Sequence, residues 1–181
     1  MADFSQWLSD DRENFLIILG DLGTGKSTLS EFLAYQLGQA FLEDPSRHPA
    51  PVVIPLREAR RAAFSLETII ASHFAVHGLP DVRFANFFHL LRQRRVVLFF
   101  DAFDEMADRI RWNETRANFA ELKRAVEPGT KVILTCRTHY FKSREEQLET
   151  LSQGGLAFSD TETDLYRAIH GDSGLSLIHI S

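Results

Sequence analysis

A strand-length apolar run that ends in a glycine-rich turn constrains this chain more than any other feature. Residues Phe15–Leu19 are all apolar, and the next eight residues read GDLGTGKS. The glycines tolerate positive φ and a close approach of the backbone, so consecutive N–H groups can face a phosphate. Helical spacing resumes at Lys26 with Leu29 and Leu33, which places those donors at a helix N-terminus. The sequence therefore predicts a strand–loop–helix unit that binds nucleotide phosphates.

Three residues have the chemistry for a phosphate–magnesium site, two in this loop and one after a later apolar run. Lys26 supplies a full positive charge to the β- and γ-phosphates, and the Ser27 hydroxyl is a magnesium ligand. Asp101 follows the apolar run Val96–Phe100, and the carboxyl ends of parallel strands lie at one edge of a sheet, so Asp101 is predicted to hold the same ion. The residues predicted to contact the nucleotide are Gly20, Asp21, Leu22, Gly23, Thr24, Gly25, Lys26, Ser27 and Thr28.

Two acids and an arginine are the candidates for hydrolytic chemistry. Asp104 and Glu105 come shortly after Asp101, and a carboxylate there can orient or deprotonate an attacking water. We favour Glu105 for this role, with Asp104 as the main alternative. Arg137 follows the apolar run that ends at Thr135. Its spacing fits either a contact with the γ-phosphate or a surface ion pair with a nearby acid.

Strand and helix patterns alternate along the chain, which predicts a parallel sheet covered on both faces. The predicted strands are Phe15–Leu19, Pro51–Pro55, Val96–Phe100 and Lys131–Thr135. The predicted helices are Lys26–Leu37, Ser65–His77, Arg83–Arg94 and Asn113–Val126, after a short lead-in helix within residues 1–14. We expect Asn113 to cap the last of these helices, and Pro128-Gly129 to stop it.

The composition of the chain argues against several classes of function. The formal net charge of −5 argues against a domain that binds nucleic acid by neutralising phosphates. The single cysteine, Cys136, permits no intrachain disulfide and fits a reducing compartment. The longest apolar runs are strand-length, so we expect no membrane contact and a cytoplasmic location. His73 and His77 stand four apart on a predicted helix without a third ligand, which favours a solvated helix face over a metal site.

Three motifs in order resemble the NACHT family of STAND NTPases, in its bacterial form. They are GDLGTGKST (residues 20–28), VVLFFDAFDE (residues 96–105) and ILTCRTHYF (residues 133–141). The small Ala102 directly after Asp101, with the acidic pair Asp104-Glu105, is the specific part of the likeness. PVVIPLREA (residues 51–59) is similar to the strand before the second helix of this group. The likeness favours a γ-phosphate contact for Arg137.

The resemblance implies a P-loop NTPase fold: an α/β three-layer sandwich whose mostly parallel sheet has five strands in the order 5-1-4-3-2. It also implies ATP or ADP with Mg²⁺ as ligands, and slow hydrolysis. ADP would hold a closed monomer, and exchange for ATP would let subunits of the full-length protein oligomerise, in a setting such as antiphage defence. The alternatives are a remodelling ATPase of AAA+ type and a P-loop kinase.

The end of the chain does not fit this pattern. We assign residues 15–170 to the domain and expect its fifth strand near Gly155–Ser159 or later. The chain ends GDSGLSLIHIS, which resembles the translated read-through of a sequencing adapter. The hypothesis is that residues 171–181 are a non-native tail that adds no element, and that the natural gene continues beyond about Ser173.

Overall fold

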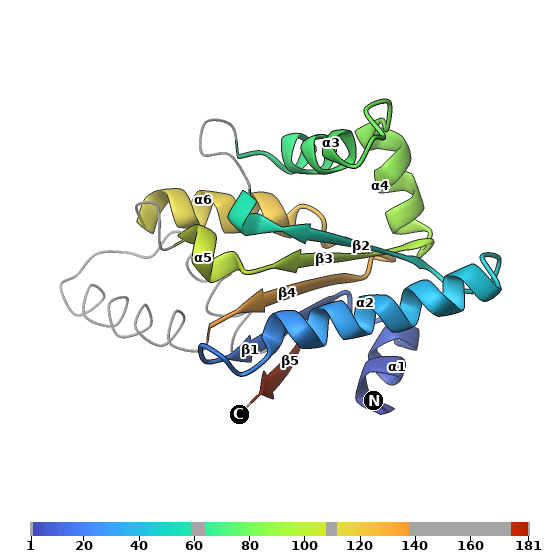
Figure 1. Cartoon of the computed structure of the whole chain (residues 1–181), viewed down its shortest axis with the longest axis horizontal. Helices are drawn as coiled ribbons and strands as arrows, with labels where there is room; N and C mark the ends of the chain where they lie inside the picture. Colours follow the sequence, from blue (N-terminus) through green and yellow to red (C-terminus); the bar gives the residue numbers. More distant parts are fainter. Residues whose placement is uncertain (1, 59–63, 108–111, 138–174, 181) are drawn as a thin grey trace.

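The computed structural model describes residues 2–58, 64–107, 112–137 and 175–180 of the chain. Helices and strands alternate along it, as the apolar patterns predict (Figure 1). In chain order the elements are α1 (Ala2–Ser9), β1 (Phe15–Gly20), α2 (Lys26–Glu43), β2 (Ala50–Pro55), the 3₁₀ turn η1 (Leu56–Glu58), α3 (Leu66–Val76), α4 (Phe84–Arg92), β3 (Val96–Asp101), α5 (Phe103–Ala107), α6 (Trp112–Lys123), β4 (Val132–Cys136) and β5 (Leu175–Ile180).

The five strands form one sheet in the order β2-β3-β4-β1-β5. Read from the other edge, this is the predicted order 5-1-4-3-2, which is confirmed. All four strand pairs are parallel. Val132 of β4 lies opposite Phe15 of β1 on one side and opposite Leu98 of β3 on the other. Strands β1, β3 and β4 are buried along their whole length, which explains why their sequences are continuously apolar and do not alternate.

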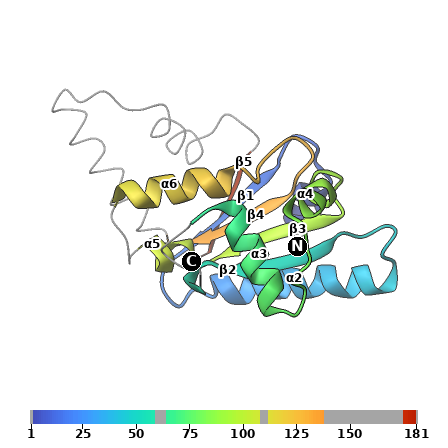
Figure 2. The ribbon, with the colours of Figure 1, turned by 90° about the horizontal axis from the view of Figure 1, so that it is seen from above.

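Helices cover both faces of the sheet, so the molecule has three layers (Figures 1 and 2). Successive side chains of a strand point to opposite faces, and the core accordingly divides in two. Leu16 and Ile18 of β1 pack with Leu33 and Leu37 of α2. The second cluster, on the opposite face, contains Ile17 together with residues of α3, α4 and α6. The predicted three-layer α/β sandwich is confirmed.

Helix α1 is fixed to the sheet by a buried lysine. Lys131, at the start of β4, is 1% exposed. Its ammonium group donates hydrogen bonds to the backbone carbonyls of Trp7, Asp10 (2.7 Å) and Glu13 (2.6 Å) and lies 4.5 Å from the centre of the Trp7 ring. The Trp7 carbonyl belongs to the last turn of α1, where carbonyls lack a helical partner. Those of Asp10 and Glu13 belong to the segment that leads into β1, so one cation fixes both the helix end and this connection. The lead-in helix is therefore part of the packed domain.

Two expectations about element boundaries need correction. Asn113 lies inside α6, which begins at Trp112, so Asn113 is not its cap. The helix also ends at Lys123, with Ala125 and Val126 in the following turn. The apolar periodicity fixes that a helix forms here, but its ends depend on local turns that periodicity does not report.

The end of the chain also differs from the expectation. Residues 155–159 lie outside the described residues. Leu175–Ile180, predicted to add no element, form β5 and pair in parallel along the whole of β1, from Phe15 opposite Leu175 to Gly20 opposite Ile180. The physical reason is that β1 offers a free row of backbone hydrogen-bonding groups on that side, which an apolar segment can satisfy.

Candidate functional site

The glycine-rich loop joins β1 to the N-terminus of α2. Gly23 and Gly25 have φ angles of 82° and 85°, in the left-handed region that glycine adopts without strain. Gly25 is the N-cap of α2, and no side chain caps the helix there. The first N–H groups of a helix have no partner within it, so here they can donate hydrogen bonds to a phosphate. The positive end of the dipole of this 18-residue helix also favours an anion at this place.

In this structure Lys26 folds back over the loop. Its ammonium nitrogen donates to the carbonyl oxygens of Gly20 (2.8 Å) and Asp21 (2.9 Å). The Thr24 hydroxyl donates to the same Asp21 oxygen at 2.8 Å, which closes the turn. The lysine charge is therefore held beside the inner surface of the loop, where the phosphates of a nucleotide would lie.

Oxygen ligands for a magnesium ion meet at the ends of β3 and α2. The Ser27 hydroxyl lies 3.2 Å from one carboxylate oxygen of Asp101. Two neighbouring oxygens of an octahedral Mg²⁺ site are about 3 Å apart, because each is bound at about 2.1 Å. The spacing of the pair thus fits the ion that the sequence predicts. No cluster of three or more His, Cys, Asp or Glu side chains suited to a metal occurs in the described part of the chain.

Thr135 of β4 holds this arrangement together. Its hydroxyl donates to Asp101 at 2.6 Å and accepts the backbone N–H of Ala102 at 2.8 Å. Ala102 has a φ angle of 60°, unusual for a residue other than glycine, and its side chain is buried. A small residue therefore suits this position, since the backbone turns sharply here out of β3 and into α5.

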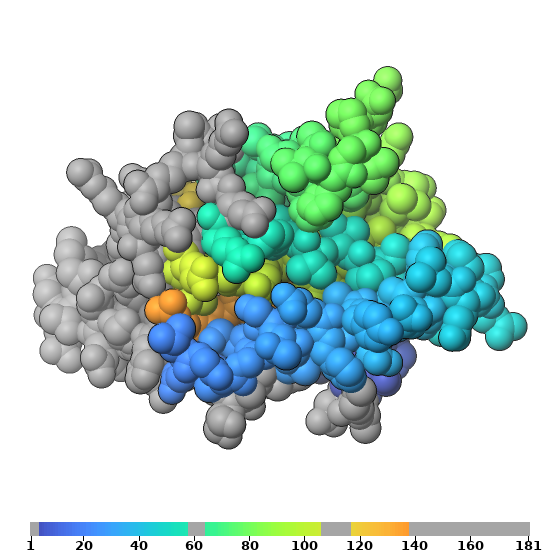
Figure 3. Space-filling view, viewed as in Figure 1, coloured from blue at the N-terminus to red at the C-terminus, as the bar shows by residue number. Residues whose placement is uncertain are grey.

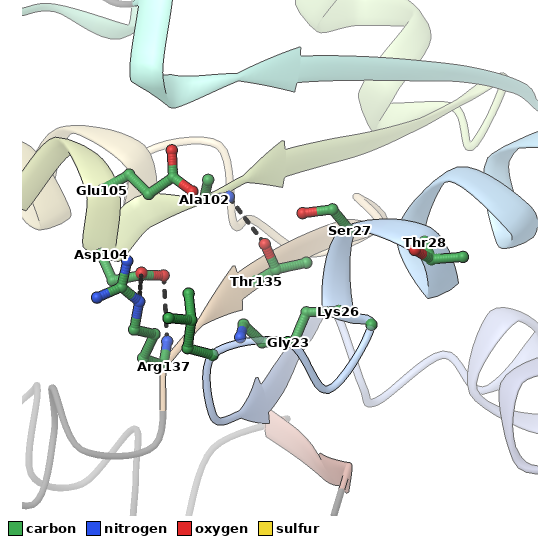
Figure 4. A pocket seen from close by; sticks show the side chains of 11 residues that line it. Gly23, Lys26, Ser27, Thr28, Ala102, Asp104, Glu105, Thr135 and Arg137 are labelled. Carbon is green, nitrogen blue, oxygen red and sulfur yellow. Dashed lines mark hydrogen bonds and ion pairs between the residues drawn. The ribbon is translucent and has the colours of Figure 1, made fainter.

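Asp104 and Arg137 form an ion pair at the edge of the site (Figure 4). One carboxylate oxygen of Asp104 lies 2.6 Å from Arg137 Nε, and the other accepts the backbone N–H of Arg137 at 3.1 Å. Burial raises the pKa of Asp104 above its ordinary value, although the charge of Arg137 opposes that rise. Glu105, one residue further along α5, is only partly buried.

These groups surround one cavity of about 270 Å³. That volume lies just below the range typical of whole-ligand pockets, about 300–1,000 Å³, and suits the phosphate end of a nucleotide. In Figure 3 the carboxyl end of β4, in orange, reaches the surface between the loop, in blue, and α5, in yellow-green. The cavity is lined by Leu22, Gly23, Gly25, Lys26, Ser27, Thr28, Ala102, Asp104, Glu105, Thr135 and Arg137.

Most of the residues selected from the sequence thus meet at one place, although four do not line the cavity. Gly20 and Asp21 shape the loop through their contacts with Lys26, Thr24 does so through its bond to Asp21, and Asp101 accepts a hydrogen bond from the Ser27 hydroxyl. Thr135 is the residue that sequence reasoning missed. Its signal was a lone hydroxyl within the otherwise apolar run Val132–Cys136, at the end of a strand next to Asp101.

This fold, with a glycine-rich phosphate loop between β1 and α2, defines the class of P-loop nucleoside triphosphatases. Within that class the chain belongs to the NACHT domain family, whose profile matches residues 14–172. An uncharacterized WD repeat-containing protein of Nostoc is 35% identical over 144 residues, which are 77% of this chain. The chain spans only 9% of the length of that relative. The domain is accordingly a nucleotide-binding NTPase domain.

A solved structure has the same fold. The structure of Drosophila ORC bound to DNA matches 99% of this chain and 41% of its own, with a TM-score of 0.51 and 15% sequence identity. C. elegans PCH-2 matches 91% of this chain and 35% of its own at 13% identity, with a TM-score of 0.39. At 15% identity, the likeness to the ORC structure establishes the fold alone. In the described segments, no helix is long and apolar enough to cross a membrane.

Proposed function

We propose that this domain is a nucleotide-controlled switch that binds ATP or ADP with Mg²⁺ and hydrolyses ATP slowly. The proposal rests on the convergence of Lys26, Ser27, Glu105 and Arg137 on one cavity at the carboxyl edge of the sheet. A phosphate loop, a hydroxyl ligand for magnesium, an acid and an arginine are the groups that phosphoryl transfer to water requires.

Each of these side chains has a distinct proposed role. Lys26 leaves the carbonyls of the loop and binds the β- and γ-phosphates. Ser27 and Asp101 hold Mg²⁺, which neutralises charge that develops on the phosphate oxygens. Glu105 accepts a proton from the attacking water, or orients it, because its carboxylate lines the cavity and is less buried than that of Asp104. Arg137 contacts the γ-phosphate once it leaves Asp104.

The wider role follows from membership of the NACHT family together with the resemblance to STAND proteins. We propose that the ADP form of the full-length protein is a closed monomer and that the ATP form assembles into homo-oligomers. The Nostoc relative is named for WD repeats, so a similar repeat array is the proposed sensor. Bacterial defence against phage is the proposed setting, which a phage challenge of cells carrying the full-length gene, wild-type or Lys26→Ala, would test.

The direct test of the site is nucleotide binding by the 181-residue chain. With fluorescent ATP and Mg²⁺, we expect saturable binding that Lys26→Ala reduces by at least tenfold, since it loses a charge-assisted contact with two phosphates. Lys123→Ala is a matched control, because that lysine lies at the far end of α6. Binding that survives unchanged in Lys26→Ala would refute the phosphate site. Glu105→Gln should bind ATP and fail to hydrolyse it, and continued turnover would remove Glu105 as the base.

A further inference from the structure

The two acids that begin α5 are in different situations, although they are adjacent in the sequence. Asp104 is 3% exposed, and both of its carboxylate oxygens are engaged by Arg137. Glu105 is partly exposed, and it has no partner of this kind among the hydrogen bonds and ion pairs given above. A carboxylate that is buried and held at two points is poorly placed to take a proton from water. The geometry therefore separates the roles of the two acids.

Arg137 in turn is held at the margin of the cavity. Its side chain is 32% exposed, its Nε group is bound to Asp104, and the residue itself lines the cavity beside Gly23 and Lys26. Figure 4 shows the guanidinium group turned toward Asp104, opposite the loop. A γ-phosphate that arrives beside Lys26 is an anion that competes with Asp104 for the same guanidinium. A nucleoside diphosphate has no phosphate at that place.

We propose that Asp104 is a specificity-determining residue: it retains Arg137 when a diphosphate is bound and thereby weakens triphosphate binding relative to diphosphate binding. This inference rests on the proposed function, since it assumes that nucleotide phosphates occupy the loop. The Asp104–Arg137 pair stays intact in the nucleotide-free and diphosphate states. The free energy needed to break it therefore weakens the binding of a triphosphate alone. Asp104 thus biases the domain toward its diphosphate form, and the γ-phosphate must displace an internal carboxylate to engage Arg137.

Asp104→Asn is a suitable test because it keeps one contact with Arg137 and replaces the acceptor of the other contact by a donor. An asparagine oxygen can still accept the backbone N–H of Arg137, which preserves the junction between α5 and β4. The other oxygen becomes an NH₂ group, a donor that faces the donor Nε of Arg137. The ion pair between residue 104 and Arg137 is therefore lost while the fold is retained, and circular dichroism would verify the fold.

The measurement is the dissociation constant of a non-hydrolysable ATP analogue and of ADP, each with Mg²⁺. We expect Asp104→Asn to bind the analogue about tenfold more tightly, the contribution of about one charge-assisted hydrogen bond, and to bind ADP with unchanged affinity. Glu105→Gln is the matched control, since it removes the same charge one residue away. If it gives the same gain, the effect is general charge repulsion and the proposal is wrong.

A double-mutant cycle with Arg137→Ala tests the mechanism, and should Asp104→Asn fold poorly the single variant Arg137→Ala still tests it, because unchanged binding of the ATP analogue by that variant would overturn the proposal. Arg137→Ala alone should weaken the ATP analogue and spare ADP, and adding Asp104→Asn to it should change neither affinity. Weaker binding of the ATP analogue by Asp104→Asn would show that Asp104 orients Arg137 toward the phosphate, and an equal shift for both nucleotides would show a structural role. Either result overturns the proposal. If the wild-type chain binds neither nucleotide, the proposed function itself fails.

Discussion

Substitution of Thr135 by valine tests how Asp101, the proposed magnesium ligand, is held in place. Valine has nearly the shape of threonine but no hydroxyl, so Thr135→Val leaves the packing of β4 intact. It removes the bond to Asp101 and leaves the buried N–H of Ala102 without its acceptor. An unsatisfied buried donor costs about 1–3 kcal/mol, and a hydrogen bond to a charged group contributes about 1.5–3 kcal/mol. Allowing for partial relaxation, we expect a loss of about 2–4 kcal/mol in the free energy of unfolding.

The assay for this prediction is urea unfolding of the 181-residue chain, followed by circular dichroism. Thr135→Ser is the matched control, because it keeps the hydroxyl and loses one buried methyl group, at a cost of about 1 kcal/mol. Equal stability of the valine and serine variants would refute the argument that the hydroxyl holds Asp101 and Ala102. If the function proposed above is correct, the valine variant also needs more Mg²⁺ for half-maximal nucleotide binding, since Asp101 is less well oriented.

Three further predictions concern the surroundings of the site. Ala102→Val should lower the free energy of unfolding by about 1–2 kcal/mol, because a β-branched residue is strained at a φ of 60°. Ala102→Gly should be close to neutral, and equal urea midpoints for the two variants would contradict this reasoning. Lys131→Met removes the ammonium donor from the carbonyls of Trp7, at the end of α1, and of Asp10 and Glu13, in the segment that follows it. We expect a loss of about 2 kcal/mol and a red shift of Trp7 fluorescence, and an unshifted spectrum would show that α1 stays docked. Burial raises the pKa of Asp104, so the folded state binds this proton more tightly than the unfolded state does, and stability falls as pH rises from the unfolded pKa through the folded one. The stability of Asp104→Asn relative to wild type should accordingly increase from pH 4 to pH 7, and a decrease would mean that Arg137 outweighs burial.

Strong local signals made much of the fold predictable. The apolar runs Phe15–Leu19 and Val96–Phe100 are long enough and apolar enough to be central strands, and both are buried as predicted. Ser65 also caps α3 as its position suggests, accepting the Thr68 N–H at 3.2 Å. Where the signal was weak, the prediction failed. Asn113 is a good cap residue by type, yet the helix begins before it, because a single side chain does not fix a helix end.

Contacts between distant segments were beyond prediction. The bonds from Thr135 to Asp101 and Ala102 join residues more than thirty positions apart, and nothing in the sequence of either strand specifies the partner. The same holds for the pairing of Arg137 with Asp104, which the sequence left open beside a γ-phosphate contact. In the structure the arginine does pair with an acid, and that acid is the one considered as an alternative base.

The sequence by itself determined the phosphate loop, the alternation of strands and helices, and the acids that follow β3, because glycine spacing and apolar periodicity are local properties of a chain. Both adjacent acids line the cavity, and the tertiary structure decided which of them is buried against Arg137 and which stays partly exposed. It also decided that Lys131 anchors α1, and that Leu175–Ile180 pair with β1. These outcomes depend on strand order and register, since only the assembled sheet sets the distance between side chains that lie far apart along the chain.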